Sequence, residues 1–432
     1  MSSVEQTLET WCHPTTIKFD NPQAEENYKK RTRRIADSIQ LKRPDRVPLC
    51  LSLSNFPALH SGMTLVDIAE KPQQAHQAWL DVLDDLQPDI GAAPAPVNPV
   101  FRAIGYRVLR LPGVHLPPTS NFQYVEKEYV KAEEFYDHFL DDPTDFLLRV
   151  LLPRVSDTFE PLSRVRTFRE HLLSYERIPA SLGQFAQPEM LQMLQQVMEA
   201  AKAANATLQT NMGYTKRMLA RGFPTLGGGF TQAPFDIIGD HIRGTTGVML
   251  DMFRHPEKLL AAMEKLVPYM IELGLQGREK GNPSVMIPLH KHADGFISLQ
   301  QFRTFYWPTL RKVMLGIIDA GLVPAPFWEG ENTSRLETIR DIPRGSAIYM
   351  FQDVDLHRFK EICGDTVCFQ GNVPISLLCA GTPQQVRDYV KKLIGILGKD
   401  GGLLVNSSVN VEDARYENIR AMVEAVREYG NN

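Results

Sequence analysis

Apolar residues in the second half of the chain form short unbroken runs, separated by longer stretches with helical spacing. The runs cover residues 284–289, 322–327, 347–351, 367–370 and 403–405. Runs without a polar residue at every second position are typical of strands buried on both faces. In most stretches between them, apolar positions recur every three or four residues, which predicts amphipathic helices. The predicted helices cover residues 247–273, 299–320, 334–341, 355–363, 383–397 and 413–429.

The first half of the chain is less regular. A leucine-rich run at residues 47–53 predicts a strand, and the spacing at residues 72–86 and 190–220 predicts helices. Between about residues 89 and 188, repeated prolines favour loops and short elements. Three consecutive glycines at 227–229 fit either a backbone segment close to a ligand or a plain tight turn.

Strands that alternate with helices favour a parallel sheet flanked by helices. A doubly wound sheet and a closed barrel both satisfy this pattern. The chain has 432 residues and no Gly-x-Gly-x-x-Gly turn after any predicted strand, which favours the barrel. We therefore predict an α/β fold, a (β/α)8 TIM barrel over residues 43–432, preceded by an N-terminal helical extension over residues 1–42.

Composition and charge exclude several classes of partner. The formal net charge is −4, so no basic field favours nucleic acid or an anionic membrane surface. The most apolar long segment, residues 313–328, is interrupted by Asp319 and Pro324, and a membrane-spanning helix is not expected. The five cysteines form no Cys-x-x-Cys pair and the first residues do not resemble a signal peptide, so we expect reduced thiols and a cytoplasmic location.

Polar residues gather where the predicted strands end, which is where the working residues of such a barrel lie. His290 and His292 are two positions apart, so on an extended segment both could face one cation. Alternatively, each is an ordinary hydrogen-bonded histidine. Glu329 shares a side with Phe327 and fits a metal ligand or a general acid. At the later strand ends, the candidates for cofactor binding are Asn372, Asn406 and Ser408.

Four short motifs, in this order and spacing, resemble the uroporphyrinogen decarboxylase superfamily. They are Arg-Pro-Asp-Arg-Val-Pro at 43–48, Gly-Asn-Val-Pro at 371–374, Gly-Thr-Pro at 381–383 and Glu-Asn-Ile-Arg-Ala-Met at 417–422. The resemblance implies a (β/α)8 barrel and one of two activities. One is cofactor-free decarboxylation of a porphyrinogen, and the other is zinc-dependent methyl transfer to or from a corrinoid.

The resemblance favours the methyltransferase branch. The decarboxylases carry Arg-Gln-Ala-Gly-Arg after the first strand, whereas residues 52–57 here contain no arginine, and a substrate with many carboxylates needs paired cations. The branch's coenzyme M methyltransferases bind zinc through His-x-Cys-Gly and a second cysteine. By alignment Phe327, Glu329 and Ser408 replace those ligands. Glu329, His290 and His292 are the substitute zinc ligands that we expect.

The expected function is that of a corrinoid (cobalamin)-dependent methyltransferase, which moves a methyl group between a small organic substrate and a corrinoid. Glu329 and His290 would act on the leaving group, with Asp294 and Asp353 as orienting carboxylates. The side chains of Phe56, Phe327 and Trp328 suit an uncharged or aromatic substrate.

A corrinoid-binding loop would read Asp-x-His-x-x-Gly, and Asp355 and His357 begin that motif, but Lys360 stands in place of its glycine. The corrinoid would therefore arrive on a separate corrinoid protein or bind at the barrel mouth as free cofactor. The resemblance leaves a homodimer open.

Two alternatives remain at this point. One is a metal-free decarboxylase of a smaller acid, for which Arg102, Arg107 and Arg243 are candidate substrate ligands. The other is a barrel that binds a corrinoid or a substrate without catalysis.

Overall fold

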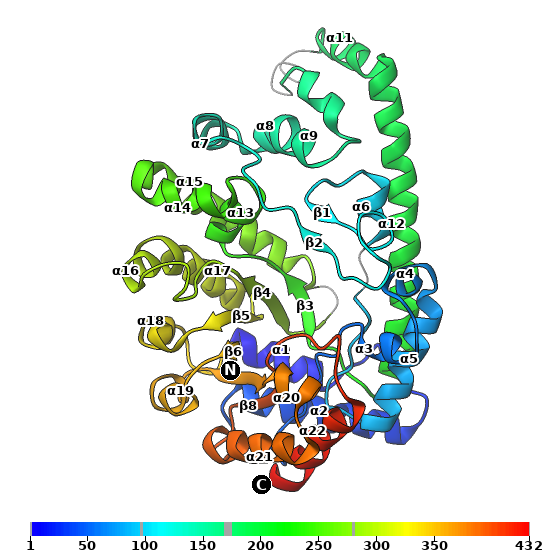
Figure 1. Cartoon of the computed structure of the whole chain (residues 1–432), viewed down its shortest axis with the longest axis vertical. Coiled ribbons are helices and arrows are strands. Elements are labelled where there is room, and N and C mark those ends of the chain that lie inside the picture. Colours follow the sequence, from blue (N-terminus) through cyan, green and yellow to red (C-terminus); the bar gives the residue numbers. More distant parts are fainter. Residues whose placement is uncertain (1, 96–97, 168–174, 279–280, 432) are drawn as a thin grey trace.

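The central sheet is parallel, and its strands follow chain order. The computed structural model describes residues 2–95, 98–167, 175–278 and 281–431. Within these residues, six strands pair in the order β3-β4-β5-β6-β7-β8, with helices flanking the sheet (Figure 1). They are β3 (Gly227–Phe230), β4 (Ser284–Leu289), β5 (Val323–Glu331), β6 (Ile348–Asp353), β7 (Cys368–Val373) and β8 (Leu403–Ser407). The predicted alternation of strands and helices is confirmed, and β4 matches the prediction residue for residue.

Two further extended segments close the sheet, one beginning at residue 47 and the other at residue 89. The backbone bonds that join them are Val405 N to Pro48 O (2.9 Å), Cys50 N to Val405 O (2.8 Å), Asp89 N to Leu49 O (2.9 Å) and Gly91 N to Pro224 O (2.8 Å). The described residues thus supply eight strand positions, and the prediction of a (β/α)8 barrel is confirmed. The predicted strand at 47–53 forms only an isolated bridge at Leu49, and Pro48 has no N–H with which to extend a ladder.

The helices of the second half follow the strands. They are α13 (Pro234–His241), α14 (Gly244–Arg254), α15 (Pro256–Leu275), α16 (Leu299–Gln301), α17 (Trp307–Asp319), α18 (Leu336–Ile339), α19 (Leu356–Cys363), α20 (Ile375–Ala380), α21 (Pro383–Leu393) and α22 (Tyr416–Tyr429). The single helix predicted at 247–273 is wrong in one respect. Pro256 begins a new helix there, because proline fits a first turn but breaks a helix interior.

The first half contains more irregular connections. Its elements are α1 (Ser3–Cys12), α2 (Pro22–Ile39), α3 (Phe56–His60), α4 (Leu65–Glu70), α5 (Pro72–Leu86), α6 (Pro99–Ala103), β1 (Leu109–Arg110), β2 (Gln123–Tyr124), α7 (Ala132–Asp141), α8 (Pro143–Phe146), α9 (Leu152–Val155), α11 (Ile178–Gly183) and α12 (Pro188–Ala220). The predicted helix at 72–86 coincides with α5. The helix α12 projects beyond the barrel with α11 near its end (Figure 1), and we call these two helices the arm.

The N-terminal helices α1 and α2 pack against the barrel. Leu8, Trp11 and Ile35 from these helices share a buried apolar cluster with Val323 and Leu404 near the starts of β5 and β8. The helices therefore cover the amino ends of the strands and leave the carboxyl ends for chemistry. The domain boundary after residue 42 stays a prediction.

Two features bear on the environment of the chain. None of the described helices combines the length and apolar character that crossing a bilayer requires. All five cysteines are free thiols.

Candidate functional site

Two candidate side chains meet where β4 and β5 end. The register pairs Leu289 of β4 with Trp328 of β5, so that His290 and Glu329, the next residues, come side by side. His290 Nε2 lies 3.9 Å from Glu329 Oε1. Phe327 and Glu329 are partly exposed while Trp328 between them is buried, as expected from the alternation of side chains along a strand. His290 and Glu329, which the sequence places at the ends of neighbouring strands, thus lie within ion-pair distance of each other.

The helix α13, which follows β3, adds two carboxylates to this place. Asp236 and Asp240 are one turn apart and therefore on one helix face. Asp240 Oδ2 lies 2.6 Å from His290 Nδ1, and Lys291 Nζ donates to the other oxygen of the same carboxylate. We call the following residues the rim site: Asp236, Asp240, His290, Lys291, Tyr306 and Glu329.

Asp236 is the buried hub of the rim site. It accepts hydrogen bonds from His290 N at 3.0 Å, Lys291 N at 3.1 Å and Tyr306 Oη at 2.5 Å. Burial, and then the nearby charge of Asp240, raise the pKa of Asp236 to about 6. The hub holds the start of the loop after β4, and thereby fixes the direction of the His290 ring.

His290 is held as a cation. Burial opposes the charged ring, but the bond to Asp240 and the negative charges of Asp236, Asp240 and Glu329 raise the pKa of His290 to about 9. The same bond, together with Lys291, outweighs burial at Asp240 and lowers the pKa of that carboxyl. At neutral pH, Nδ1–H therefore donates to Asp240 and Nε2–H faces Glu329.

Glu329 is the more accessible acid of the pair. Its side chain is 40% exposed, against 30% for His290. Burial raises the pKa of Glu329, the charge of His290 opposes this, and Asp240 adds to it. A carboxyl with a raised pKa beside a cationic imidazole forms a pair within which a proton can be shared.

His292 does not join His290. Its ring is fully buried and lies 5.7 Å from the ring of Tyr306 and 5.1 Å from that of Trp328. Burial lowers the pKa of His292 to about 3. The expected sharing of one cation by the two histidines is therefore wrong, because the chain turns after His290 and directs the second ring into the core.

The zinc set expected at this place does not form. Among the residues that the structure describes, no three His, Cys, Asp or Glu side chains are grouped so as to hold a metal ion. His290 Nδ1 is engaged by Asp240, and only Nε2 and the Glu329 carboxylate remain. Two donors fall short of the three protein ligands that a catalytic zinc requires.

The two carboxylates expected to orient the site have contacts of their own. Asp294 pairs with the buried Arg335 at 3.0 Å and accepts a hydrogen bond from Ser334 at 2.6 Å. Asp353 is exposed at the end of β6, paired in register with Glu331. A catalytic role for Asp294 or Asp353 stays a prediction.

The three candidates for cofactor binding are engaged within the chain. Asn372 accepts from Tyr389 Oη at 2.9 Å, and Ser408 Oγ accepts from Ile375 N at 3.2 Å. Asn406 exchanges two hydrogen bonds with Ser52, at 3.0 and 2.8 Å. Asn406 thus helps to join the first and last strand positions of the barrel, and a cofactor role for the three residues stays a prediction.

The aromatic residues expected to suit the substrate are placed differently from one another. Phe56 and Trp328 are buried, and the Trp328 ring packs among core rings such as Tyr349, 5.5 Å away. Since both side chains are buried, their suitability for an uncharged substrate stays a prediction. Phe327 alone of the three is partly exposed. Tyr124 in β2 is exposed, and besides desolvation the negative charges of Asp240 and Glu329 contribute to raising its pKa.

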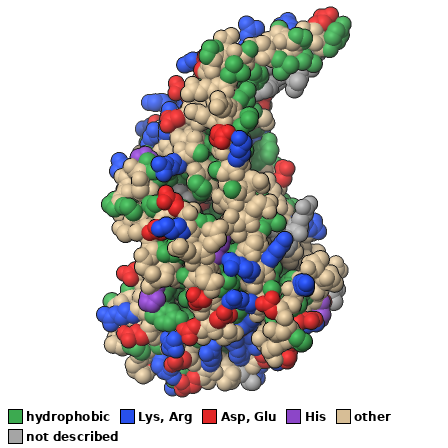
Figure 2. Space-filling model, turned by 90° about the vertical axis from the view of Figure 1, so that its right-hand side faces the viewer, with side chains coloured by type: hydrophobic (Ala, Val, Ile, Leu, Met, Phe, Trp, Pro, Cys, Tyr) green, Lys and Arg blue, Asp and Glu red, His purple; other side chains and the backbone are tan. Residues whose placement is uncertain are grey.

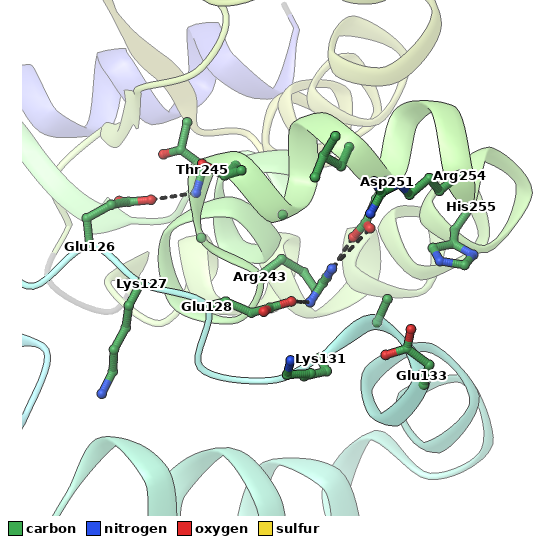
Figure 3. Close-up of a pocket in the computed structure, with 15 residues that line it drawn as sticks. Glu126, Lys127, Glu128, Lys131, Glu133, Arg243, Thr245, Asp251, Arg254 and His255 are labelled. Carbon is green, nitrogen blue, oxygen red and sulfur yellow. Dashed lines mark hydrogen bonds and ion pairs between the residues drawn. The ribbon is translucent and has the colours of Figure 1, made fainter.

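The candidate arginines of the decarboxylase alternative are also engaged elsewhere. Arg243 lines a pocket of about 420 Å³ beside α14 and pairs there with Asp251, at 2.7 Å, and with Glu128 (Figure 3). Arg107 pairs with Asp157 at 2.5 Å. Arg102 lines a surface pocket with apolar neighbours such as Leu111. None of these pocket linings includes a rim-site residue.

Sequence reasoning missed Asp236, Asp240 and Tyr306. The signal was present as two aspartates four positions apart after a strand, but β3 is a glycine run that reads equally well as a turn. The glycines are needed for packing, because a Cβ on Gly229 would lie 2.0 Å from the Gly274 carbonyl of α15. The glycine run therefore reflects close contact between a strand and a helix.

The incomplete corrinoid motif is a helix start. Asp355 accepts hydrogen bonds from His357 N at 2.9 Å and from Arg358 N at 3.0 Å, and so caps α19. Lys360 lies within that helix. These residues do not fit a corrinoid-binding loop.

Sequence comparison finds relatives in one family. A family model described as "Uroporphyrinogen decarboxylase (URO-D)" matches residues 174–429. The uroporphyrinogen decarboxylase of Pseudoalteromonas atlantica is 25% identical over 254 residues, 58% of this chain and 68% of that protein. The uroporphyrinogen decarboxylase of Vibrio campbellii is 26% identical over 207 residues, 47% of this chain and 57% of that protein. The match thus spans little more than half the length of the Vibrio protein.

A solved structure superposes on nearly the whole chain. A methyltransferase from Methanosarcina mazei superposes with a TM-score of 0.58 at 14% identity, covering 93% of this chain and 98% of that one. At this identity the likeness shows the shared fold alone.

Proposed function

The chain belongs to the uroporphyrinogen decarboxylase (URO-D) family, and from this premise we propose that it is an enzyme transferring a methyl group between a small organic substrate and a corrinoid. The fold shared with a methyltransferase over nearly the whole chain supports the transfer class. The ion pairs of Arg107 with Asp157 and of Arg243 with Asp251 and Glu128 argue against the use of these two arginines for a polyanionic substrate. The corrinoid would arrive on a separate protein and supply the methyl acceptor in the demethylating direction.

One observation carries the proposal. A cationic histidine and a carboxyl of raised pKa stand 3.9 Å apart where three parallel strands end. Methyl transfer from oxygen, nitrogen or sulfur needs a proton donor, because the leaving atom departs with the bonding electron pair and develops negative charge. The His290–Glu329 pair provides that donor.

Each rim-site residue has a distinct role in the proposed proton transfer. Asp240 and Asp236 fix the His290 ring and keep it protonated, so that Nε2–H points toward Glu329. When the bond from the methyl carbon to the leaving atom breaks, the leaving atom keeps the bonding electron pair and takes a proton from the His290–Glu329 pair, while a corrinoid would supply the electron pair of the new bond to the methyl carbon. The pair then regains its proton from water. Tyr124 and Phe327 provide an aromatic wall for an uncharged substrate.

The test is demethylation by the purified full chain. Reduced cobalamin is supplied as the acceptor with a panel of methyl ethers, amines and thioethers, and methylation is followed by absorbance. We expect turnover of at least one neutral donor, and a loss of about tenfold to a hundredfold in Glu329→Gln, which cannot donate the proton. Glu331→Gln, a neighbouring exposed carboxylate, is the matched control.

The outcome also separates the alternatives. Release of carbon dioxide from a carboxylic acid without cobalamin would identify a decarboxylase and overturn methyl transfer. Binding of cobalamin or of a donor with no turnover under any condition would leave a barrel that binds without catalysis.

A further inference from the structure

Solvent reaches one side of the strands β4 and β5 near their carboxyl ends. Met286 and Pro288 of β4 and Phe327 of β5 are partly exposed, whereas Ile287 and Trp328, which alternate with them, are buried. Side chains point to opposite sides at successive positions of a strand. One side of this part of the sheet is therefore open to solvent, and the other side packs into the core.

The open side faces the interior of the barrel. Met350 of β6 is also partly exposed, and it packs against a buried cluster that includes Cys50, Ala325, Cys368 and Leu404. These four residues come from different strand positions around the barrel, namely the segment that begins at residue 47, β5, β7 and β8. Side chains from such separate strands can meet only inside the barrel, so Met350 points inward.

The register extends this inward side to β7. Phe327 pairs with Met350, and Met350 pairs with Gln370. Residues in register on neighbouring strands point to the same side of a sheet, so Gln370 points inward, and Asn372 does so two positions later. Neighbouring strands lie about 4.8 Å apart, which places β7 about 10 Å from β5, the strand that carries Glu329.

The two inward amides of β7 have unused hydrogen-bonding groups. Gln370 is 8% exposed and Asn372 is 4% exposed. Within the part of the chain that the structure describes, the Gln370 amide meets no hydrogen-bond partner, and Asn372 engages only its Oδ1, which accepts from Tyr389 Oη at 2.9 Å. A buried amide without a partner costs free energy, so these groups are expected to bind a ligand or ordered water.

The chemistry of this side of the barrel is neutral. In register with Gln370 and Asn372, β8 presents Leu404 and Asn406, and Cys368 lies below them on β7. A charged group bound here would be buried without a counter-ion, which is unfavourable. A neutral group that both donates and accepts hydrogen bonds matches an amide side chain, which offers an acceptor oxygen and two N–H donors.

We propose that the methyl donor carries a neutral group of this kind, such as a carboxamide, about 10 Å from the methyl group that is transferred, and that Gln370 and Asn372 bind it. The inference rests on the proposed function, because it takes the transferred methyl group to lie at the His290–Glu329 pair. Phe327 and Met350 would contact the apolar body of the donor, for which an aromatic ring has a suitable size.

Isothermal titration calorimetry of the full chain without cobalamin tests the proposal. The probes are para-methoxybenzamide, para-methoxybenzoate and para-methylanisole, which carry a neutral polar, a charged and an apolar group opposite the same methoxy group. We expect the benzamide to bind at least about tenfold more tightly than either of the others, because it alone pairs with the amides without introducing a charge.

One variant removes the amide at nearly constant size. Gln370→Leu should weaken binding of the benzamide at least about tenfold and change binding of para-methylanisole by less than about threefold. The matched control, Gln196→Leu at an exposed position of α12, should change both by less than about threefold. Circular dichroism checks that each variant is folded.

A second variant gives a gain of binding. Gln370→Lys supplies the missing cation and should reverse the preference, so that the benzoate binds more tightly than the benzamide. Equal affinity of the wild-type chain for the three probes, or unchanged benzamide affinity in Gln370→Leu, would overturn the proposal and leave ordered water as the partner of Gln370. If Gln370→Leu instead lost binding of cobalamin and kept that of the benzamide, the amides would serve the carboxamides of a corrinoid, and the proposal would again be overturned.

Turnover with reduced cobalamin separates this inference from the proposed function. If the benzamide binds through Gln370 and is not demethylated, the neutral binding site stands and methyl transfer fails. Demethylation of all three probes with equal kcat/KM would support methyl transfer and refute the selection of a neutral polar group.

Discussion

The rim site and the outer face of α12 differ in how their side chains find partners. At the rim site, a buried carboxylate accepts three hydrogen bonds and a histidine cation lies between two acids. On the outer face of α12, the side chains of Leu191, Met198 and Leu208 are each more than half exposed, and Figure 2 shows hydrophobic side chains on the projecting arm. The rim-site residues therefore have hydrogen-bond and ion-pair partners within the described part of the chain, whereas these apolar side chains lie largely in water. Substitutions should accordingly change chemistry and folding at the rim site, and have little effect on folding at the outer face of α12.

The largest effect is expected at His290. His290→Gln removes the cationic member of the His290–Glu329 pair that provides the proton, while it preserves size and polarity, and should lower the rate of methyl transfer by about 10² to 10⁴. Initial rates with the best donor of the panel measure it. His357→Gln, at an exposed position of α19, is the control. If His290→Gln kept the full rate, the rim site would not be the place of proton transfer.

The next effect is on folding. Asp236→Ala leaves a tyrosine hydroxyl and two backbone N–H groups without their acceptor, and should lower the free energy of unfolding by about 3 kcal/mol. Tyr306→Phe removes one of these three bonds and should cost about 1 kcal/mol. Urea denaturation followed by circular dichroism compares the two. Equal losses would show that Asp236 is not the hub.

The pH dependence of stability reports the charge on His290. The pKa of His290 is raised from 6.5 to about 9 in the folded chain, so its stabilising contribution is fully present below about pH 6.5 and is lost as the pH rises to about 9. The stability difference between wild type and His290→Gln should therefore shrink by up to about 2 kcal/mol over this window. A difference that grew with pH would contradict a cationic His290.

The smallest effect is expected for a substitution on the exposed outer face of α12. Leu208→Ser should change the free energy of unfolding by less than about 0.5 kcal/mol, because the side chain is already largely in water. Thermal denaturation measures it. A loss above about 2 kcal/mol would mean that Leu208 packs within its own chain.

The regular elements of the fold could be predicted because each follows from the spacing of apolar side chains within one short segment. The run at 284–289 is β4, and the helical spacing at 72–86 is α5. Residues 47–53 and 227–229 were harder, since Pro48 interrupts one ladder and the glycines of β3 are dictated by a helix that passes close behind them. In both places the backbone conformation depends on contacts with a segment that is distant in sequence.

Within the rim site, the pairing of His290 with Glu329 could be predicted, and the placement of His292 could not. Strand alternation and the shared ends of parallel strands suffice for the first. The second depends on a turn after His290 that Asp236 holds by two backbone hydrogen bonds. Asp236 lies 54 residues from His290 in the chain, and no periodic pattern connects them.

The sequence by itself determined the strand and helix order, the barrel, the family and the strand ends where chemistry lies, because these follow from side-chain periodicity and short motifs. It also contains the apolar residues of α12, although their exposure could be seen only once the chain was folded. The tertiary structure alone decided which acids surround His290, that His292 is sealed in the core, and that Arg107 and Arg243 are paired with other acids. Charge and burial are set by neighbours brought together through folding, and for that reason the ionisation of a site is a property of the fold.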